Sequence, residues 1–294
     1  MYERMIWIVG FLCLYLLGLF GIAWMSLHPL RIPVYLSPDS LGVNYQEVKL
    51  ELDGVIVRGW WLEAPGATSV MVCFHGYMMN RCELTPEACQ LWKQGISCLL
   101  LDFPGHGKSG NKKCFLGVKE KSIVVAGVRE ARRLAPGAKI GLLGSSMGSA
   151  ACAFALGDDP KLADLLILDS CYGRLNRAIN GWWNFIGGRW LALLLSPCVV
   201  LCAPMVGFNP FQVNVGDSLA KLEGVPVLIL HGDQDRLAIP SEAQANFDAA
   251  NDPKELVWFQ GCNHSEGRWE QASKYREVLF VFLRRHGFLG SINK

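Results

Sequence analysis

The sequence has almost no excess of charge of either sign, because 28 Lys and Arg residues are balanced by 26 Asp and Glu residues. The formal net charge is +2, and the basic doublets Lys112-Lys113 and Arg284-Arg285 are too short to form a patch. Nucleic-acid-binding domains usually carry a basic stripe, so no nucleic-acid partner is expected. Internal repeats and low-complexity tracts are also missing. The 294 residues, 51% of them hydrophobic, suffice for one large core or two small ones.

The number and spacing of the cysteines predict neither a disulfide framework nor a metal centre. The chain has eleven cysteines, an odd number, whereas secreted frameworks usually have an even count in a short chain. Cys73 and Cys98 lie in apolar runs, where a free thiol packs as a small hydrophobe. Cys198 and Cys202 have helical spacing without a neighbouring His or carboxylate, which predicts packing rather than ligation. We expect no metal and no cofactor. Free, packed cysteines favour a domain that faces the reducing cytosol.

Charge is completely missing from positions 5–27, a run of 23 residues. As a helix at about 1.5 Å per residue, the run would reach about 35 Å, which exceeds a hydrocarbon core of about 30 Å. Trp7 and Trp24 stand near its ends, where such rings favour the membrane interface. We therefore predict a single-pass membrane protein in which residues 1–30 form an N-terminal transmembrane anchor and residues 31–294 form the remaining domain.

A cleaved signal peptide is the alternative for the same segment. Signal peptides usually have an apolar core of about 7–15 residues followed by small residues at the cleavage site. Here the run is longer, and the sequence AWMSLHP at its end is a poor cleavage site. Arg4 precedes the run and Arg31 follows it, so the positive-inside rule does not decide the orientation.

An alternation of strands and helices follows a Pro-rich connector. Two alternating runs at 45–52 and 55–64, split by Asp53-Gly54, predict a β-hairpin. Later apolar runs are mostly continuous, which suits strands covered on both faces of a parallel sheet. These runs lie at 69–74, 96–103, 139–144, 163–170, 225–232 and 255–261. Helix-like stretches lie at 83–95, 117–135, 147–156, 241–250 and 268–286. The pattern predicts an α/β fold with a mostly parallel sheet flanked by helices.

The stretch LDFPGHGKSGN at 101–111 contains G-x-G-x-x-G and Gly-Lys-Ser, which suggest a phosphate-binding loop. A dinucleotide fingerprint needs a helix that opens directly on the glycines, but NKKCFLG intervenes here. A P-loop needs a glycine five residues before Gly107, where the chain has Asp102. We therefore expect a tight loop after a strand, not a phosphate site.

The segment KIGLLGSSMGSAACAFAL carries the strongest chemical signal. It contains Gly144-Ser145-Ser146-Met147-Gly148, a G-x-S-x-G pattern between an apolar strand and a helix of small residues. This context is that of a nucleophile elbow, which would expose the hydroxyl of Ser146 at the edge of the sheet. The N–H of Met147 would lie at a helix N-terminus, where it favours an oxyanion. An ordinary Gly/Ser-rich turn is the alternative.

A nucleophilic serine needs a base and a carboxylate that orients the base. In this architecture the chain order is Ser, then Asp or Glu, then His. Asp233 and Asp235 follow the apolar run at 225–232, and only His264 and His286 come later in the chain. His264 lies in the loop GCNHSEG and is the better candidate, because His286 ends the last predicted helix.

From about residue 45 onward the chain resembles serine α/β-hydrolases. More narrowly, it is similar to membrane-anchored hydrolases grouped with prolyl-oligopeptidase-like and serine-aminopeptidase-like branches. The resemblance is carried by five motifs in the expected order, over some 220 residues. They are the oxyanion turn FHGYMMNR, the loop DFPGHGKSG, the elbow GSSMGS, the acid loop HGDQDRLAIP and the histidine loop GCNHS.

The resemblance implies a role for each matching position. Ser146 would be the nucleophile, His264 the general base and then the general acid, and Asp235 the carboxylate that orients the imidazole. Tyr77 and Met147 would offer backbone N–H groups to the oxyanion. Neither a metal nor an organic cofactor is needed for this chemistry.

The long interval at 171–224 falls where such hydrolases carry a lid, so we expect a helical lid insertion there. Its Trp182, Trp183 and Trp190 are candidate substrate-binding residues, with contact to the bilayer or packing on the core as alternatives. The expected function is hydrolysis of a carboxylic ester or thioester with a hydrophobic acyl group, in a small-molecule or lipid-like substrate. A serine peptidase of the aminopeptidase or prolyl-oligopeptidase-like type and a non-catalytic binding module with the same fold remain as alternatives.

Overall fold

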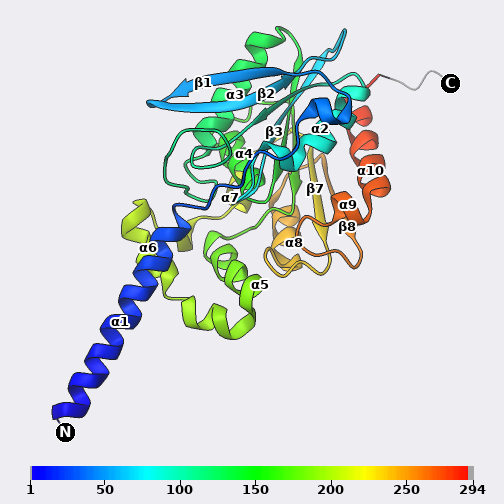
Figure 1. The fold of residues 1–294 in the computed structure, drawn as a ribbon. Coiled ribbons are helices and arrows are strands. Elements are labelled where there is room, and N and C mark those ends of the chain that lie inside the picture. The colour runs from blue at the N-terminus through cyan, green and yellow to red at the C-terminus, as the bar shows by residue number, and fades with distance from the viewer. Residues whose placement is uncertain (1, 291–294) are drawn as a thin grey trace.

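A computed structural model describes residues 2–290. Eight strands form one sheet with helices on both faces, and a long N-terminal helix projects away from this body (Figure 1). The spatial order of the strands is β1-β2-β4-β3-β5-β6-β7-β8. Their bounds are β1 Gln46–Leu52, β2 Val55–Leu62, β3 Ser69–Phe74, β4 Ser97–Leu101, β5 Lys139–Ser145, β6 Leu165–Asp169, β7 Val227–Gly232 and β8 Lys254–Phe259.

The predicted hairpin and the predicted mostly parallel sheet are both confirmed. Strand β1 pairs with β2 in antiparallel fashion across the Asp53-Gly54 turn, and β2 also pairs antiparallel with β4. All other neighbours are parallel. The carboxyl ends of the parallel strands therefore meet at one edge of the sheet, which is where open α/β sheets bind their ligands.

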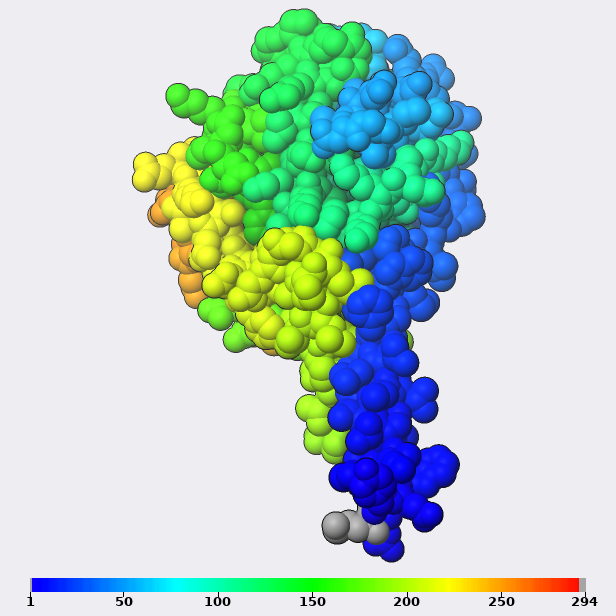
Figure 2. Space-filling view, turned by 90° about the vertical axis from the view of Figure 1, so that its left-hand side faces the viewer, coloured from blue at the N-terminus to red at the C-terminus, as the bar shows by residue number. Residues whose placement is uncertain are grey.

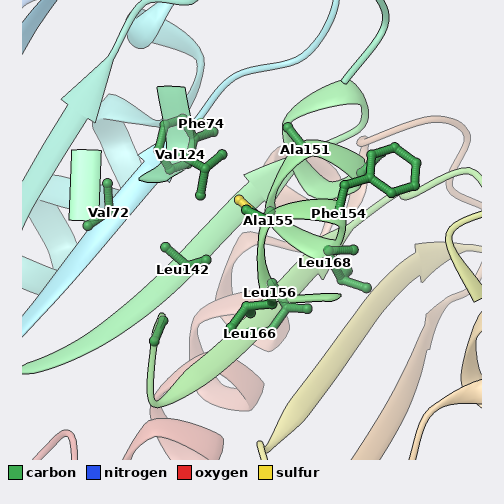
Figure 3. Close-up of a cluster of buried hydrophobic side chains, with 14 of the residues drawn as sticks. Val72, Phe74, Val124, Leu142, Ala151, Phe154, Ala155, Leu156, Leu166 and Leu168 are labelled. Atoms are coloured by element: carbon green, nitrogen blue, oxygen red, sulfur yellow. The ribbon is translucent and has the colours of Figure 1, made fainter. Parts of the chain in front are cut away.

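Each face of the sheet packs against its own set of helices. One core cluster joins the sheet to helices that include α3 and α4, and Figure 3 shows part of it, with Ala151, Phe154 and Ala155 of α4 packed over side chains of β5 and β6. The second cluster joins the other face to α2 and α10. The helices are α2 Thr85–Lys93, α3 Lys121–Leu134, α4 Met147–Asp158, α8 Pro240–Ala249, α9 Gly267–Glu270 and α10 Ala272–Arg285, and a 3-10 turn at Arg81–Leu84 precedes α2.

The helix predicted over 268–286 is in fact two helices. The backbone of Gln271 leaves the helical region, with φ −127° and ψ 43°, between α9 and α10. Its side chain donates a hydrogen bond to the carbonyl of Gln260 at 2.7 Å, which ties this break to the turn after β8. The apolar periodicity of the sequence continues across the break, so the pattern did not reveal it.

The interval 171–224 forms a helical insertion between β6 and β7. It contains α5 Leu175–Leu195, α6 Cys198–Val206, a 3-10 turn at Pro210–Gln212 and α7 Gly216–Leu219. Helix α5 is interrupted at Gly187 and Gly188, whose dihedral angles are not helical. Helix α6 is bent by 83° from α5.

Helix α1, Tyr2–Ser26, is the one unbroken helix within residues 2–290 that is long and apolar enough to cross a membrane. A helix of this kind can serve as an anchor or as a signal sequence. The C-terminal part of α1 packs against α6, and Figure 2 shows the insertion lying along the side of α1.

Candidate active site

Ser146 lies in the tight turn between β5 and α4, at the carboxyl edge of the sheet. Its backbone has φ 50° and ψ −111°, a conformation that non-glycine residues rarely adopt. The turn is possible because the positions two residues before and two residues after Ser146 are glycine. A Cβ at Gly144 would overlap the backbone of Ser149, and a Cβ at Gly148 would overlap the carbonyl oxygen of Phe74. The sequence pattern G-x-S-x-G therefore has a direct steric cause in this fold.

Asp235 lies in the loop between β7 and α8, with only 2% of its surface exposed. Its Oδ1 accepts hydrogen bonds from the N–H groups of Leu237 and Ala238, at 2.8 and 2.9 Å. These bonds fix the carboxylate and leave Oδ2 free to face the next loop. The other candidate, Asp233, instead accepts a hydrogen bond from the N–H of Gly261 at 2.7 Å.

His264 lies in the loop between β8 and α9 and joins the other two side chains. Its Nδ1 is 2.7 Å from Oδ2 of Asp235, and its Nε2 is 2.9 Å from Oγ of Ser146. The structure thus brings together three residues that are far apart in the sequence. His286 lies elsewhere, because its carbonyl contacts the side chain of Lys139, the residue that begins β5 at the opposite end from Ser146.

The partners of the imidazole determine where its proton lies. Nδ1 faces a carboxylate, which can only accept a hydrogen bond, so Nδ1 carries the proton and donates it. Nε2 is then the basic nitrogen and accepts the hydrogen bond of the Ser146 hydroxyl. This arrangement can remove the hydroxyl proton as the oxygen attacks an electrophilic carbon, and the buried carboxylate would stabilise the imidazolium that forms.

Two residues that line the cavity together with Ser146 have backbone N–H groups without a protein acceptor among residues 2–290. Tyr77 and Met147 both line the cavity that contains Ser146. Among residues 2–290, neither backbone N–H donates to a protein acceptor. The N–H of Met147 is the first of α4, where the helix dipole favours negative charge. These groups are therefore available to an oxygen anion.

A buried ionic network contacts the turn between β5 and α4 that carries Ser146. The sequence patterns did not predict this network. Arg268 of α9 lies with Nη2 2.7 Å from Oε1 of Glu83 and with Nε 3.0 Å from Oδ2 of Asp169. The same Oε1 of Glu83 accepts a hydrogen bond from the hydroxyl of Ser145 at 2.7 Å. Its Oε2 accepts one from the N–H of Gly76 at 2.6 Å. Glu83 therefore links the turn that follows β3 to the residue beside Ser146.

The charges of this network stabilise one another. Burial opposes ionisation of Glu83, but Arg268 and the hydrogen bonds that Glu83 accepts hold its pKa below the ordinary value. Burial raises the pKa of Asp169, and Arg268 acts against that rise. Burial also opposes the charge of Arg268, yet the two carboxylates keep the pKa of its guanidinium above the usual range. No motif marks these residues, because Glu83 lies in the short 3-10 turn before α2 and Arg268 in the four-residue helix α9.

His75 braces the turn before Tyr77 and is neutral. Burial lowers the pKa of His75 to about 4. Its Nε2 accepts a hydrogen bond from the N–H of Phe103 at 2.9 Å, so its Nδ1 carries the proton and donates it to the carbonyl of Gly76 at 2.7 Å. The ring thereby ties the turn after β3 to the loop after β4.

The glycine-rich loop after β4 is closed on its own backbone. Asp102 accepts hydrogen bonds from the N–H groups of Arg81 and Lys108, both at 2.8 Å. The N–H of Gly105 donates to the carbonyl of Gly110 at 2.8 Å. The loop N–H groups of Gly105 and Lys108 are thus bonded within the protein, to the carbonyl of Gly110 and to the side chain of Asp102.

An apolar cavity of about 450 Å³ opens beside Ser146 and His264. This volume lies within the range of about 300–1,000 Å³ that is usual for ligand sites. Of the candidate tryptophans, Trp182 and Trp183 line the cavity, whereas Trp190 does not line it and is 70% exposed. Ser26 and Leu27, at the end of α1, also line it.

Comparisons with known proteins agree with this architecture. The family model described as serine aminopeptidase, S33, matches residues 66–201. The uncharacterized protein YfhR of Salmonella typhi is 21% identical over 251 residues, covering 79% of this chain and 78% of that protein.

Solved structures share the fold at low sequence identity. The esterase Pf2001 of Pyrococcus furiosus superposes with a TM-score of 0.75 at 24% identity, covering 88% of this chain and 98% of that one. A bacterial membrane phospholipase A superposes with a TM-score of 0.59 at 15% identity, covering 96% of this chain and 99% of that one.

Proposed function

The chain is an α/β-hydrolase by fold, and we propose that it is a serine hydrolase of carboxylic esters or thioesters with hydrophobic acyl groups. The single observation that carries this proposal is the chain of hydrogen bonds from Asp235 through His264 to Ser146. The match to a serine aminopeptidase family model supports hydrolase chemistry, and esterases have the same fold.

In the proposed reaction, Oγ of Ser146 attacks the carbonyl carbon while Nε2 of His264 takes the hydroxyl proton. The N–H groups of Tyr77 and Met147 bind the oxygen anion of the tetrahedral intermediate. His264 then gives its proton to the leaving alcohol or thiol, which leaves an acyl group on Ser146. A water molecule, activated by the same imidazole, releases the carboxylic acid and restores the hydroxyl.

The cavity supports an apolar acyl group as the part of the substrate that is bound. Glu83 is the only carboxylate among the lining residues, and both of its oxygens are already engaged by Arg268, Ser145 and Gly76. A site for the free amino terminus of a peptide would need an available carboxylate. For this reason we favour esters and thioesters over the peptidase activity that the name of the family model suggests.

We also propose a division of the chain into an anchor and an enzyme. Residues 1–30 would hold the protein in the membrane through α1, and residues 31–294 would form the hydrolase domain. Residues 171–224 would be its lid, because α5 and α6 cover the cavity beside Ser146.

Covalent labelling of the purified full chain with a fluorophosphonate tests the function. We expect labelling of the wild-type chain and its loss in Ser146→Ala, with full labelling of the matched control Ser122→Ala, whose serine lies exposed on α3. Turnover of p-nitrophenyl esters should rise with acyl-chain length. An unlabelled wild-type chain would contradict the proposal, and turnover of acetyl esters alone would contradict the choice of substrate.

A further inference from the structure

Exposed apolar side chains are concentrated on two neighbouring parts of the molecule, α1 and the region of α5 and α6. On α5 and α6 they are Phe185, Ile186, Trp190, Leu193, Leu194 and Val200. Outside these helices the large apolar residues exposed among residues 2–290 are scattered, at Leu30, Tyr35, Leu41, Phe211, Ile239, Trp269 and Val281. A contiguous apolar surface of this kind marks a contact with a partner or a membrane.

The composition of the insertion suits lipid. Between positions 178 and 216 the only charged residue is Arg189. Its guanidinium lies 4.7 Å from the ring centroid of Trp190, and both side chains are typical of the membrane interface. The long stem of an arginine can also reach the phosphate level from a position below it.

Specific contacts hold this surface against α1. The hydroxyl of Tyr15 donates a hydrogen bond to the carbonyl of Leu194 at 2.5 Å, and the thiol of Cys198 donates to the carbonyl of Leu19 at 3.5 Å. Leu19, Leu195 and Cys198 form a small buried cluster of their own. The exposed side of the insertion therefore continues the lipid-facing surface of the helix that is long enough to span a membrane.

The contact between Tyr15 and Leu194 also indicates how deep the end of α5 would lie in a membrane that α1 spans. Tyr15 stands nine residues before Trp24, the aromatic residue near the end of α1, which corresponds to about 13 Å along a helix. One leaflet contributes about 15 Å to a hydrocarbon core of about 30 Å. With α1 spanning the bilayer, the turn that follows α5 would reach close to the middle of the membrane.

The cavity connects this region to the reacting groups. The residues that line it include Cys198 and Cys202 of α6, Leu27 beyond α1, and Ser146 and His264. An acyl chain that enters between α1 and α6 would meet apolar side chains along the whole path to the hydroxyl of Ser146.

We propose that α5 and α6 insert beside α1 into the leaflet next to the hydrolase domain, and that the cavity takes the acyl chain of a membrane lipid directly from this leaflet. This inference rests on the proposed function for the hydrolysis of that lipid. The insertion of α5 and α6 is a separate claim that can be measured without turnover.

Photocrosslinking in lipid nanodiscs tests the insertion. The full-length Ser146→Ala chain is reconstituted with a phosphatidylcholine that carries a diazirine in the acyl chain, and the adducts are mapped by mass spectrometry. We expect adducts on residues 185–201 as well as on α1. Leu193→Glu, at a position that is 69% exposed, should reduce the adducts on 185–201 at least fivefold and leave those on α1 unchanged. The matched control is Val281→Glu on α10, at a position that is 43% exposed, and it should change neither.

Adducts confined to α1 would overturn the proposal. So would lipid adducts at 185–201 that form in nanodiscs holding one chain and vanish in nanodiscs holding two, because a second copy of the chain would then cover this surface. In the catalytically intact chain, Leu193→Glu should lower kcat/KM for a long-chain ester embedded in the nanodisc about tenfold and leave the hydrolysis of a soluble short-chain ester unchanged. If no ester is hydrolysed by the wild-type chain, the proposed function fails while the crosslinks still report on the insertion.

Discussion

The hydroxyl of Tyr77 donates a hydrogen bond to the carbonyl of Ser26 at 2.8 Å, and this bond joins the turn after β3 to the last residue of α1. The ring of Tyr77 also packs edge-on against Trp182 of α5, with the ring centroids 5.3 Å apart. One side chain therefore touches the N-terminal helix and the insertion, and Tyr77 also lines the cavity beside Ser146.

Tyr77→Phe should uncouple the turn after β3 from α1. The change keeps the ring and removes one partly buried hydrogen bond, which typically contributes about 0.5–1.5 kcal/mol. We expect kcat for a soluble ester to fall up to about tenfold with little change in KM, because the turn that carries the proposed oxyanion donor loses a support. Steady-state kinetics measures this effect, and an unchanged kcat would mean that the bond has no part in positioning the turn.

Asp235→Asn should abolish most of the activity without unfolding the chain. An amide cannot hold the imidazole in the tautomer that keeps Nε2 basic, and a comparable change in a Ser-His-Asp triad lowers kcat about 10⁴-fold. Asp233→Asn is the matched control, since its carboxylate accepts a hydrogen bond from Gly261 and does not contact His264. Equal losses in the two variants would contradict the assignment of Asp235.

Arg268→Met should destabilise the fold strongly. The variant would leave Glu83 and Asp169 buried without their cation, and removal of one partner from such a pair typically costs about 3–5 kcal/mol. Arg285→Met, which breaks an exposed ion pair with Glu255, should cost less than about 1 kcal/mol. Thermal unfolding in detergent compares the two, and similar melting temperatures would show that the buried network adds nothing to stability.

Stability should decrease as the pH falls from about 6.5 to 4. The pKa of His75 is lowered from about 6.5 in the unfolded chain to about 4 in the fold, so the unfolded state takes up the proton first. The free energy of unfolding should then drop by up to about 1.4 kcal/mol per pH unit for this group and level off below pH 4. His106 adds to the loss, because burial lowers its pKa to about 3.

His75→Gln isolates the contribution of one histidine to this pH dependence. Glutamine retains a hydrogen-bonding group but does not titrate, so the slope of unfolding free energy against pH should decrease by about one proton. Urea unfolding at several pH values between 7 and 4 measures both slopes. Identical slopes for the variant and the wild type would show that His75 does not titrate in this range.

Local patterns in the sequence predicted most of the fold because each strand and each turn has a local cause. The elbow could be found because Gly144 and Gly148 are needed for steric reasons within a few residues of Ser146. His264 was a candidate because of its place in the chain order, and the family resemblance favoured Asp235 over Asp233. The parallel pairing of β7 with β8 places the loops that carry both residues at one edge of the sheet. Their mutual distances depend on the whole sheet and could not be derived from the sequence.

The remaining features depend on long-range packing that leaves no periodic signal. Glu83 and Arg268 are 185 positions apart and meet only in the folded chain. The break at Gln271 is fixed by a contact with Gln260, outside the helix. The exposure of Trp190 could not be distinguished from the partial burial of Trp182, because both lie in the same apolar segment.

The network around Arg268 limits where the polypeptide chain can be cleaved, truncated or circularly permuted. Its charged members come from the segment before α2, the end of β6 and the start of α9. Helix α9, close to the C-terminal end of the fold, therefore carries the cation that pairs with both buried carboxylates. A nick, truncation or circular permutation that detaches α9 would leave like charges facing each other beneath Ser146. Such changes should abolish the proposed hydrolase activity even where Ser146, Asp235 and His264 are all kept.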